Sequence, residues 1–236
     1  MQVFKAVLEA HSYVFTATYE RGHTLGNFAY PSHYLHNYAL IYSLNGVANE
    51  YFIYKNQKLY NFVERKINNG EPIYALPAKP LRVYLKGFTY STKAELLVEA
   101  KRKPQIVAPS SGYYLYFSPY SKFETYIIAE EKNDIPPFIR FGKKREGIFK
   151  IILEKIKYQK TQGVFTVNFP FNPFDVRDAV KILDKKLIFS IKGSKKISNP
   201  EMLEVVTGRV NGYCLRIVNS KRVIHIVVPK TYWNKL

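Results

Sequence analysis

Apolar and polar side chains alternate in several separate stretches of this chain, and this pattern constrains them to strands. The period of two that a half-buried strand requires recurs in residues 4–9, 81–86 and 165–169. Residues 213–218 and 222–228 flank Asn219-Ser220-Lys221, which favours a hairpin turn. Because the second of these segments is apolar on both faces through Pro229, we expect it to lie centrally in a sheet.

Helical patterns are fewer than strand patterns. Ser32 is placed to cap a helix whose apolar residues recur through 35–42 and which ends at Asn45-Gly46. A second helix is predicted from Asp175 to about Leu183, and a third from Ser198 to Gly208. This order of elements suits one domain, residues 1–236, with an α+β fold of ferredoxin-like kind that carries insertions.

Composition excludes several classes of protein. With 47% hydrophobic residues the chain is not generally disordered, and no apolar stretch approaches the roughly 18 residues of a membrane span. Lys5 and Glu9 interrupt any signal-peptide core, and a single cysteine forms no internal disulfide, so we expect a cytoplasmic protein without a membrane partner. Cys214 lies in an apolar strand, which favours a core position over a nucleophile.

The net charge of +18 indicates a polyanionic partner. Residues 1–78 carry 6 basic and 5 acidic side chains, whereas residues 79–236 carry 30 and 13. Self-repulsion of this size disfavours compaction, so a nucleic acid is the partner that we expect. A membrane surface, or solubility alone as on a Lys-rich thermophile surface, are the alternatives.

The first candidate RNA-binding cluster lies on an extended segment. Arg82, Tyr84 and Lys86 share one face with Phe88 and Tyr90. Cations there would hold phosphates, while the rings offer stacking platforms to unpaired bases. The alternative is a strand that packs its aromatic side chains against an insertion.

Further cationic clusters follow along the chain. Arg140, Lys143, Lys144 and Arg145 surround Gly142, where the backbone can approach a phosphate closely; a solvated turn is the alternative. Another run carries the side chains Lys101, Arg102 and Lys103. Residues 181–196 add six basic side chains and one acidic one. Each run alone is typical of a solvated surface, and together they favour nucleic-acid binding.

Metal and nucleotide-triphosphate sites have little support in the sequence. Cys-x-x-Cys is absent, and Gly142-Lys143-Lys144 lacks the upstream glycine and the following Ser or Thr of a P-loop. His33 and His36 have helical i, i+3 spacing, for which we favour a helix N-terminus with exposed polar rings over metal ligation. We therefore expect no metal and no cofactor, and retain both histidines as RNA-contact candidates.

Three short motifs occur in one order across residues 1 to about 218. They are His36-Asn-Tyr-Ala-Leu-Ile-Tyr-Ser-Leu-Asn-Gly46, Ile139-Arg140-Phe-Gly-Lys143 and Asn172-Pro-Phe-Asp-Val176. Together they resemble stretches of the Cas-five-type small subunit of subtype I-D CRISPR Cascade complexes. Lys144-Arg145-Glu146 departs from that family, which has small and aromatic residues after Gly-Lys.

The resemblance implies an RNA-recognition-like RAMP domain with an inserted β-hairpin thumb, about residues 79–119, and extra C-terminal strands. It also implies a non-catalytic subunit of an antiviral ribonucleoprotein complex. Such a subunit binds the 5′ handle of the guide RNA and bridges backbone subunits to the large subunit, with target DNA nearby. Base pairing then reads the target, and the protein favours single-stranded nucleotides.

A second hypothesis comes from relatives in another Cascade subtype that process the guide precursor. A metal-independent endoribonuclease needs a base for the 2′-hydroxyl proton and an acid for the leaving oxygen. His33, His36 and a tyrosine such as Tyr34 or Tyr38 are the residues that would serve, although no sequence pattern requires them to.

The basic loop gives a test of RNA binding. Substituting Lys143, Lys144 and Arg145 by alanine should lower the affinity for single-stranded RNA and flatten its salt dependence, because fewer counterions are released on binding. Titrations at several salt concentrations measure both quantities. Unchanged affinity and slope would remove this loop from the site.

Overall fold

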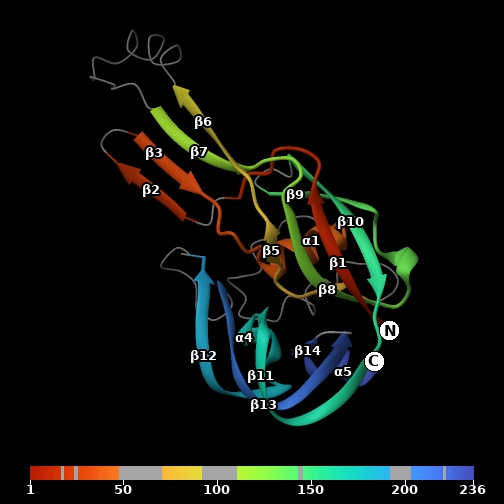
Figure 1. Ribbon diagram of the computed structural model, residues 1–236. Helices are drawn as coiled ribbons and strands as arrows, with labels where there is room; N and C mark the ends of the chain where they lie inside the picture. The colour runs from red at the N-terminus through yellow and green to blue at the C-terminus, as the bar shows by residue number, and fades with distance from the viewer. Residues whose placement is uncertain are drawn as a thin grey trace.

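A computed structural model of the chain describes residues 1–16, 19–23, 26–47, 71–91, 111–142, 146–191, 203–219 and 222–236. The described chain is mostly β, and its strands form three sheets (Figure 1). The main sheet lies in the middle of the molecule, a hairpin sheet projects from one end, and a curled C-terminal sheet lies at the other (Figure 1).

The main sheet is antiparallel, with β1 (Gln2–Ala10) at its centre. Its other strands are β4 (Tyr74–Ala75), β5 (Lys79–Arg82), β8 (Lys122–Ala129), β9 (Phe138–Phe141) and β10 (Gly147–Lys155). They follow the order β4-β8-β1-β10-β9. Strand β5 pairs with the same strand, β8, as β4 does, but nearer the start of β8. The 3₁₀ helix η2 (Lys132–Asp134) joins β8 to β9. Because β1 pairs on both edges, its register fixes which side chains of the sheet face the core.

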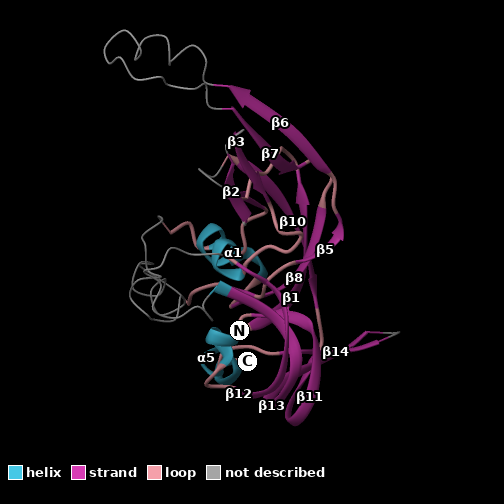
Figure 2. Ribbon diagram, turned by 90° about the vertical axis from the view of Figure 1, so that its left-hand side faces the viewer, coloured by secondary structure: helices cyan, strands magenta, loops and turns pink. Residues whose placement is uncertain are grey.

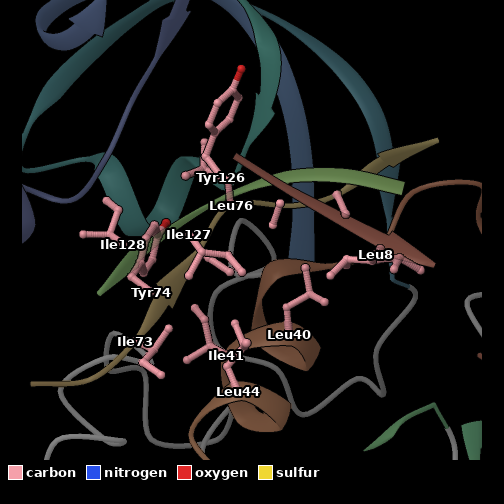
Figure 3. Packing of buried hydrophobic residues seen from close by; sticks show 14 of the residues in the cluster. Leu8, Leu40, Ile41, Leu44, Ile73, Tyr74, Leu76, Tyr126, Ile127 and Ile128 are labelled. Carbon is pink, nitrogen blue, oxygen red and sulfur yellow. The ribbon is translucent and has the colours of Figure 1, made fainter. Parts of the chain in front are cut away.

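Helix α1 (Asn37–Leu44) covers one face of the main sheet (Figure 2). Its Leu40, Ile41 and Leu44 are buried, and they point toward the sheet, where Ile127 of β8 points back at them (Figure 3). The neighbouring Tyr126 points to the other side of the sheet (Figure 3). The face opposite α1 is called the outer face below.

The hairpin sheet projects from the end of the main sheet at which β1 finishes (Figures 1 and 2). It contains β2 (Tyr19–His23), β3 (Gly26–Tyr30), β6 (Leu85–Ser91) and β7 (Ser111–Phe117). Strands β6 and β7 pair antiparallel, and β3 joins β7 in parallel. The β6–β7 hairpin lies inside the predicted insertion 79–119, whereas β5 at the start of that range belongs to the main sheet.

The C-terminal sheet is built around the long strand β13 (Glu204–Asn219). Strand β11 (Tyr158–Phe171) follows one edge of β13, while β12 (Val180–Ser190) and then β14 (Arg222–Ile226) occupy the other. Gly163 and Gly212 face each other across β11 and β13 with φ of 152° and 149°. A side chain at Gly212 would overlap the Ala179 carbonyl oxygen, so glycine allows the close approach there.

A buried hydrogen-bond network joins α1 to the short helix α4 (Pro173–Val176). The fully buried Asp175 carboxylate accepts from Asn37 Nδ2 at 2.7 Å, from the Tyr38 hydroxyl at 2.9 Å and from the Tyr74 hydroxyl at 3.2 Å. Burial, and next the Asp175 charge, raise the pKa of Tyr38 well above its ordinary value, so this hydroxyl stays a donor. The network ties the main sheet to the C-terminal sheet.

The predicted helix after Ser32 is confirmed, but its cap is different. His36 is the N-cap, and its Nδ1 accepts from the Tyr38 N–H at 3.2 Å, while Ser32 Oγ accepts from the Tyr34 N–H. The helix ends as expected, since Asn45 is the C-cap and Gly46 has φ +62°.

The predicted helix from Asp175 to Leu183 is wrong. Asn172 caps one turn, α4, and residues 180–190 form β12 instead. Pairing with β13 prevails over the local helical pattern, because most of β12 joins the ladder of β13, whereas an isolated short helix is marginally stable.

The third predicted helix, from Ser198 to Gly208, is also not observed. Residues 198–202 lie outside the described residues, whereas residues 204–208 belong to β13. The β-branched run Val205-Val206-Thr207 prefers an extended conformation, which accounts for the difference.

The central position predicted for residues 222–229 is wrong as well. Among the described strands β14 pairs with β13 alone, and it ends at Ile226. Val227 and Val228 are nevertheless fully buried, because they pack into the two different hydrophobic cores on either side of the chain. The prediction that Cys214 is a core residue is confirmed, and burial raises the pKa of its thiol to about 12.

Helix α5 (Lys230–Lys235) follows β14 and ends the chain. Its Tyr232 is buried and donates to the Pro72 carbonyl oxygen at 2.9 Å, which fixes the helix against the main core. No helix in the described ranges combines the length and the apolar character needed to cross a membrane.

The Asp175 network predicts a large difference between two aspartates. Asp175→Asn should lower the free energy of unfolding by about 3 kcal/mol, because an amide N–H then faces buried donors that lose their acceptor. The exposed Asp184 of β12 is the matched control, and Asp184→Asn should change stability by less than about 0.5 kcal/mol. Urea unfolding measures both values, and equal effects would contradict the role of the network.

Candidate nucleic-acid interface

A row of five directly paired residues crosses the outer face from β5 to β9. In order these are Arg82, Lys122, Glu9, Lys150 and Phe138. Paired residues on adjacent strands place their side chains on the same side of a sheet. Leu8 and Phe123, the sequence neighbours of Glu9 and Lys122, are buried in the main core, so the row points away from α1. We call it the cationic row.

The charges of the cationic row are three positive and one negative. Lys122 Nζ lies 2.9 Å from Glu9 Oε2. This hydrogen bond is the main reason that the pKa of Glu9 is lowered, and the charges of His11 and Lys150 contribute, while burial opposes them. Glu9 is therefore ionised at neutral pH, and the row keeps a net positive charge.

A second row of outward-facing residues lies two residues along the strands from the cationic row, nearer the hairpin sheet. Arg140 pairs with Ile148, whose carbonyl oxygen accepts from the His11 N–H at 2.9 Å. The His11 ring meets Phe138 edge-on, with 5.8 Å between centroids. Arg82 and Arg140, two of the predicted RNA contacts, thus lie on one face at opposite edges of the same sheet.

Aromatic rings continue from this face onto the hairpin sheet. Tyr84 and Phe88 are 47% and 39% exposed, and Lys86 between them is also exposed. Phe88 packs edge-on against Tyr13 at 5.2 Å and against Tyr116 at 4.9 Å between centroids. Tyr13 is itself 45% exposed. The predicted cluster at residues 82–88 therefore combines cations with half-exposed rings.

The flanks of the predicted basic loop lie beside these rings. Gly142 has φ +90°, and a side chain there would overlap the carbonyl oxygen of Phe15, whose ring packs on Tyr116 at 4.9 Å. Burial, and next the charge of Glu146, raise the pKa of Tyr116. Lys143, Lys144 and Arg145 themselves lie outside the described residues. Both ends of their loop nonetheless meet the base of the hairpin sheet.

The other residues predicted to contact RNA are not brought together with the outer face by the described part of the structure. Lys101, Arg102 and Lys103 lie between β6 and β7 in the sequence and outside the described residues. His33 is exposed, as expected, whereas His36 is 6% exposed and caps α1. The position of His36 is that of a structural residue.

Sequence reasoning missed three members of the outer face, Glu9, Lys122 and Lys150. Each lies on a strand with one buried face, so alternation alone shows that it points outward. Only the register shows that the three lie side by side, because β1, β8 and β10 are far apart in sequence.

In the ranges that the structure describes, no group of three or more His, Cys, Asp or Glu side chains is arranged to hold a metal ion. The side chains named above supply charge, hydrogen-bonding groups and aromatic rings to the outer face.

The fold and this face define a basic, mostly β protein whose main sheet carries a row of cations on one face. A sequence model of the family described as type I-D CRISPR-associated protein Cas5/Csc1 matches residues 1–221. The chain belongs to this family, so the resemblance seen in its motifs is confirmed.

The chain is also similar to a CRISPR protein of known structure. The crystal structure of a CRISPR protein from Archaeoglobus fulgidus is 14% identical, with a TM-score of 0.43, over 96% of this chain and 100% of that one. A search of the curated proteins finds no match.

Two glycines with positive φ test the packing of Gly142, which begins the basic loop at residues 143–145. Gly142→Ala should lower the free energy of unfolding by about 3 kcal/mol, because its methyl group overlaps the Phe15 backbone. Gly46→Ala is the matched control, since Gly46 also has positive φ but open space around it, and should cost about 1 kcal/mol. Denaturant unfolding compares them, and equal losses would show that the Gly142 contact is unimportant.

Proposed function

We propose that this chain is a non-catalytic subunit of a type I-D CRISPR effector complex and that it binds the 5′ handle of the guide RNA on its outer face. The cationic row carries this proposal. Three cations across one face of a sheet suit contacts with the phosphates of a strand, and the rings of Tyr13, Phe88 and Phe138 suit stacking with unpaired bases.

Strand order supports an RNA-recognition-like core. Read from β10 through β1 and β8 to β4, the sheet places the fourth, first, third and second strands of a ferredoxin-like unit side by side. Helix α1 follows β1 as in that unit, and η2 with β9 stands where a second helix would lie. In RNA-recognition sheets, the exposed face of the central strands binds single-stranded RNA.

The projecting hairpin supports the proposed thumb. Strands β6 and β7 extend away from the main sheet, and β2 and β3 widen them (Figure 1). Among the described residues of this sheet, Phe28 and Phe88 remain 44% and 39% exposed, which suits contacts outside the chain. We infer that this sheet and the outer face together bridge the backbone subunits to the large subunit, with target DNA nearby.

The non-catalytic role is favoured by the surroundings of the residues proposed for cleavage. His36 is buried as a helix cap, and the hydroxyl of Tyr38 is bound to Asp175 with a raised pKa. Neither group is poised to exchange a proton with a bound RNA at neutral pH. Among the described residues, His33 is the exposed member of the pair.

A double variant tests the RNA-binding face. Replacing Arg140 and Lys150 by alanine should weaken binding of a single-stranded guide RNA and reduce the slope of log K against log salt by about 1.4, from about 0.7 for each lost phosphate contact. Filter binding or anisotropy at several salt concentrations measures both. The RNA recovered after incubation in chelator should remain full length.

The control removes the same charge elsewhere. Lys132 and Lys155 lie at the end of the main sheet remote from the hairpin, and both are exposed. Their double alanine variant should leave affinity and slope within experimental error of the unmodified protein. Equal losses in the two variants would reject a localised site, and discrete cleavage products would reject the non-catalytic role.

A further inference from the structure

Glu9 is an anion in the centre of a cationic face. Lys122 and Lys150 flank it on the neighbouring strands, and the charge of His11 also acts on it. Because its pKa is lowered, Glu9 is charged at neutral pH and repels any phosphate placed over it. An RNA backbone on this face is therefore held to the flanking cations, and a different part of the nucleotide faces the carboxylate.

The hydrogen-bonding capacity of Glu9 exceeds what Lys122 uses. A carboxylate offers about four lone-pair positions, and the Lys122 ammonium group occupies one at Oε2. The Glu9 side chain is 17% exposed, so it is accessible from the outer face. A ligand that satisfies the remaining acceptors must present N–H or O–H donors.

Among the RNA bases, guanine offers the best match to these acceptors. Its Watson–Crick edge presents two adjacent donors, N1–H and N2–H₂, beside the acceptor O6. Adenine presents an acceptor at N1 beside one amino group, uracil presents one donor between two acceptors, and cytosine presents one amino group beside two acceptors. The pair Glu9 and Lys150 is complementary to guanine, since the carboxylate accepts from N1–H and N2–H₂ while the ammonium donates to O6.

The spacing on the sheet supports a stacked base. Phe138 lies two strands from Glu9 in the cationic row and is 51% exposed. Two strand spacings are about 10 Å. This distance accommodates a purine stacked on the Phe138 ring with its Watson–Crick edge directed toward Glu9 and Lys150.

We propose that Glu9, together with Lys150, recognises an unpaired guanine in RNA bound to the outer face. This inference rests on the proposed function and names the base specificity of the same site. Glu9 is a specificity-determining residue, whereas the surrounding cations supply affinity without regard to sequence.

The test compares octameric RNAs that differ at one base. An oligouridine with a single central guanosine should bind the full-length protein about tenfold more tightly than the same RNA with adenosine. Inosine retains N1–H and O6 but lacks the 2-amino group, and its affinity should be intermediate. Anisotropy titration at one fixed salt concentration measures all three.

Variants separate base recognition from charge. In Glu9→Gln the affinity for the adenosine octamer should rise, because an anion is removed, while the preference for guanosine over adenosine falls to within about twofold. Glu130→Gln removes the same charge beyond the far end of β8, where Glu130 is exposed, and should keep the tenfold preference. Thermal melting of both variants confirms that they are folded.

The outcomes distinguish this inference from the function on which it rests. Equal binding of guanosine and adenosine octamers by the unmodified protein, or an unchanged preference in Glu9→Gln, would overturn guanine recognition and leave RNA binding intact. Absence of binding to any octamer at low salt would overturn the proposed function itself.

Discussion

The pairing of β1 with both β8 and β10 is the constraint on which the rest of the structure depends. A slip of one residue would move Glu9 into the core and Leu8 to the surface, because successive side chains point to opposite faces. Burial of Leu8 and Ala10 against the α1 side excludes that slip. The same register that forms the core therefore aligns the side chains of the cationic row.

The buried Asp175 network explains two of the motifs that indicate the family. His36 caps α1 and Asn172 caps α4 (Pro173–Val176), and the two helices meet across 138 positions of sequence at the Asn37–Asp175 hydrogen bond. Three donors satisfy one carboxylate there, which offsets the desolvation of its charge. These residues hold two sheets together, so their role is structural, and the face that we propose binds RNA lies elsewhere.

The errors of sequence prediction have a common cause. A helix does begin near the predicted position, at Pro173, but it lasts one turn because residues 180–190 pair with β13. The apolar run that ends at Val228 is buried by two separate cores and not by flanking strands. In each case a contact with a distant segment prevails over the local pattern, whose energy per residue is small.

Alternation in the sequence determined most of the strands and the hairpin at residues 213–226, because these depend on residue types a few positions apart. The composition determined the basic excess. The sequence also determined that Arg82 and Arg140 lie in extended, cation-rich segments. Tertiary structure alone decided that these arginines share a face with Lys122, Glu9 and Lys150. The physical reason is that cross-strand register arises from packing of the whole core, which no single segment contains.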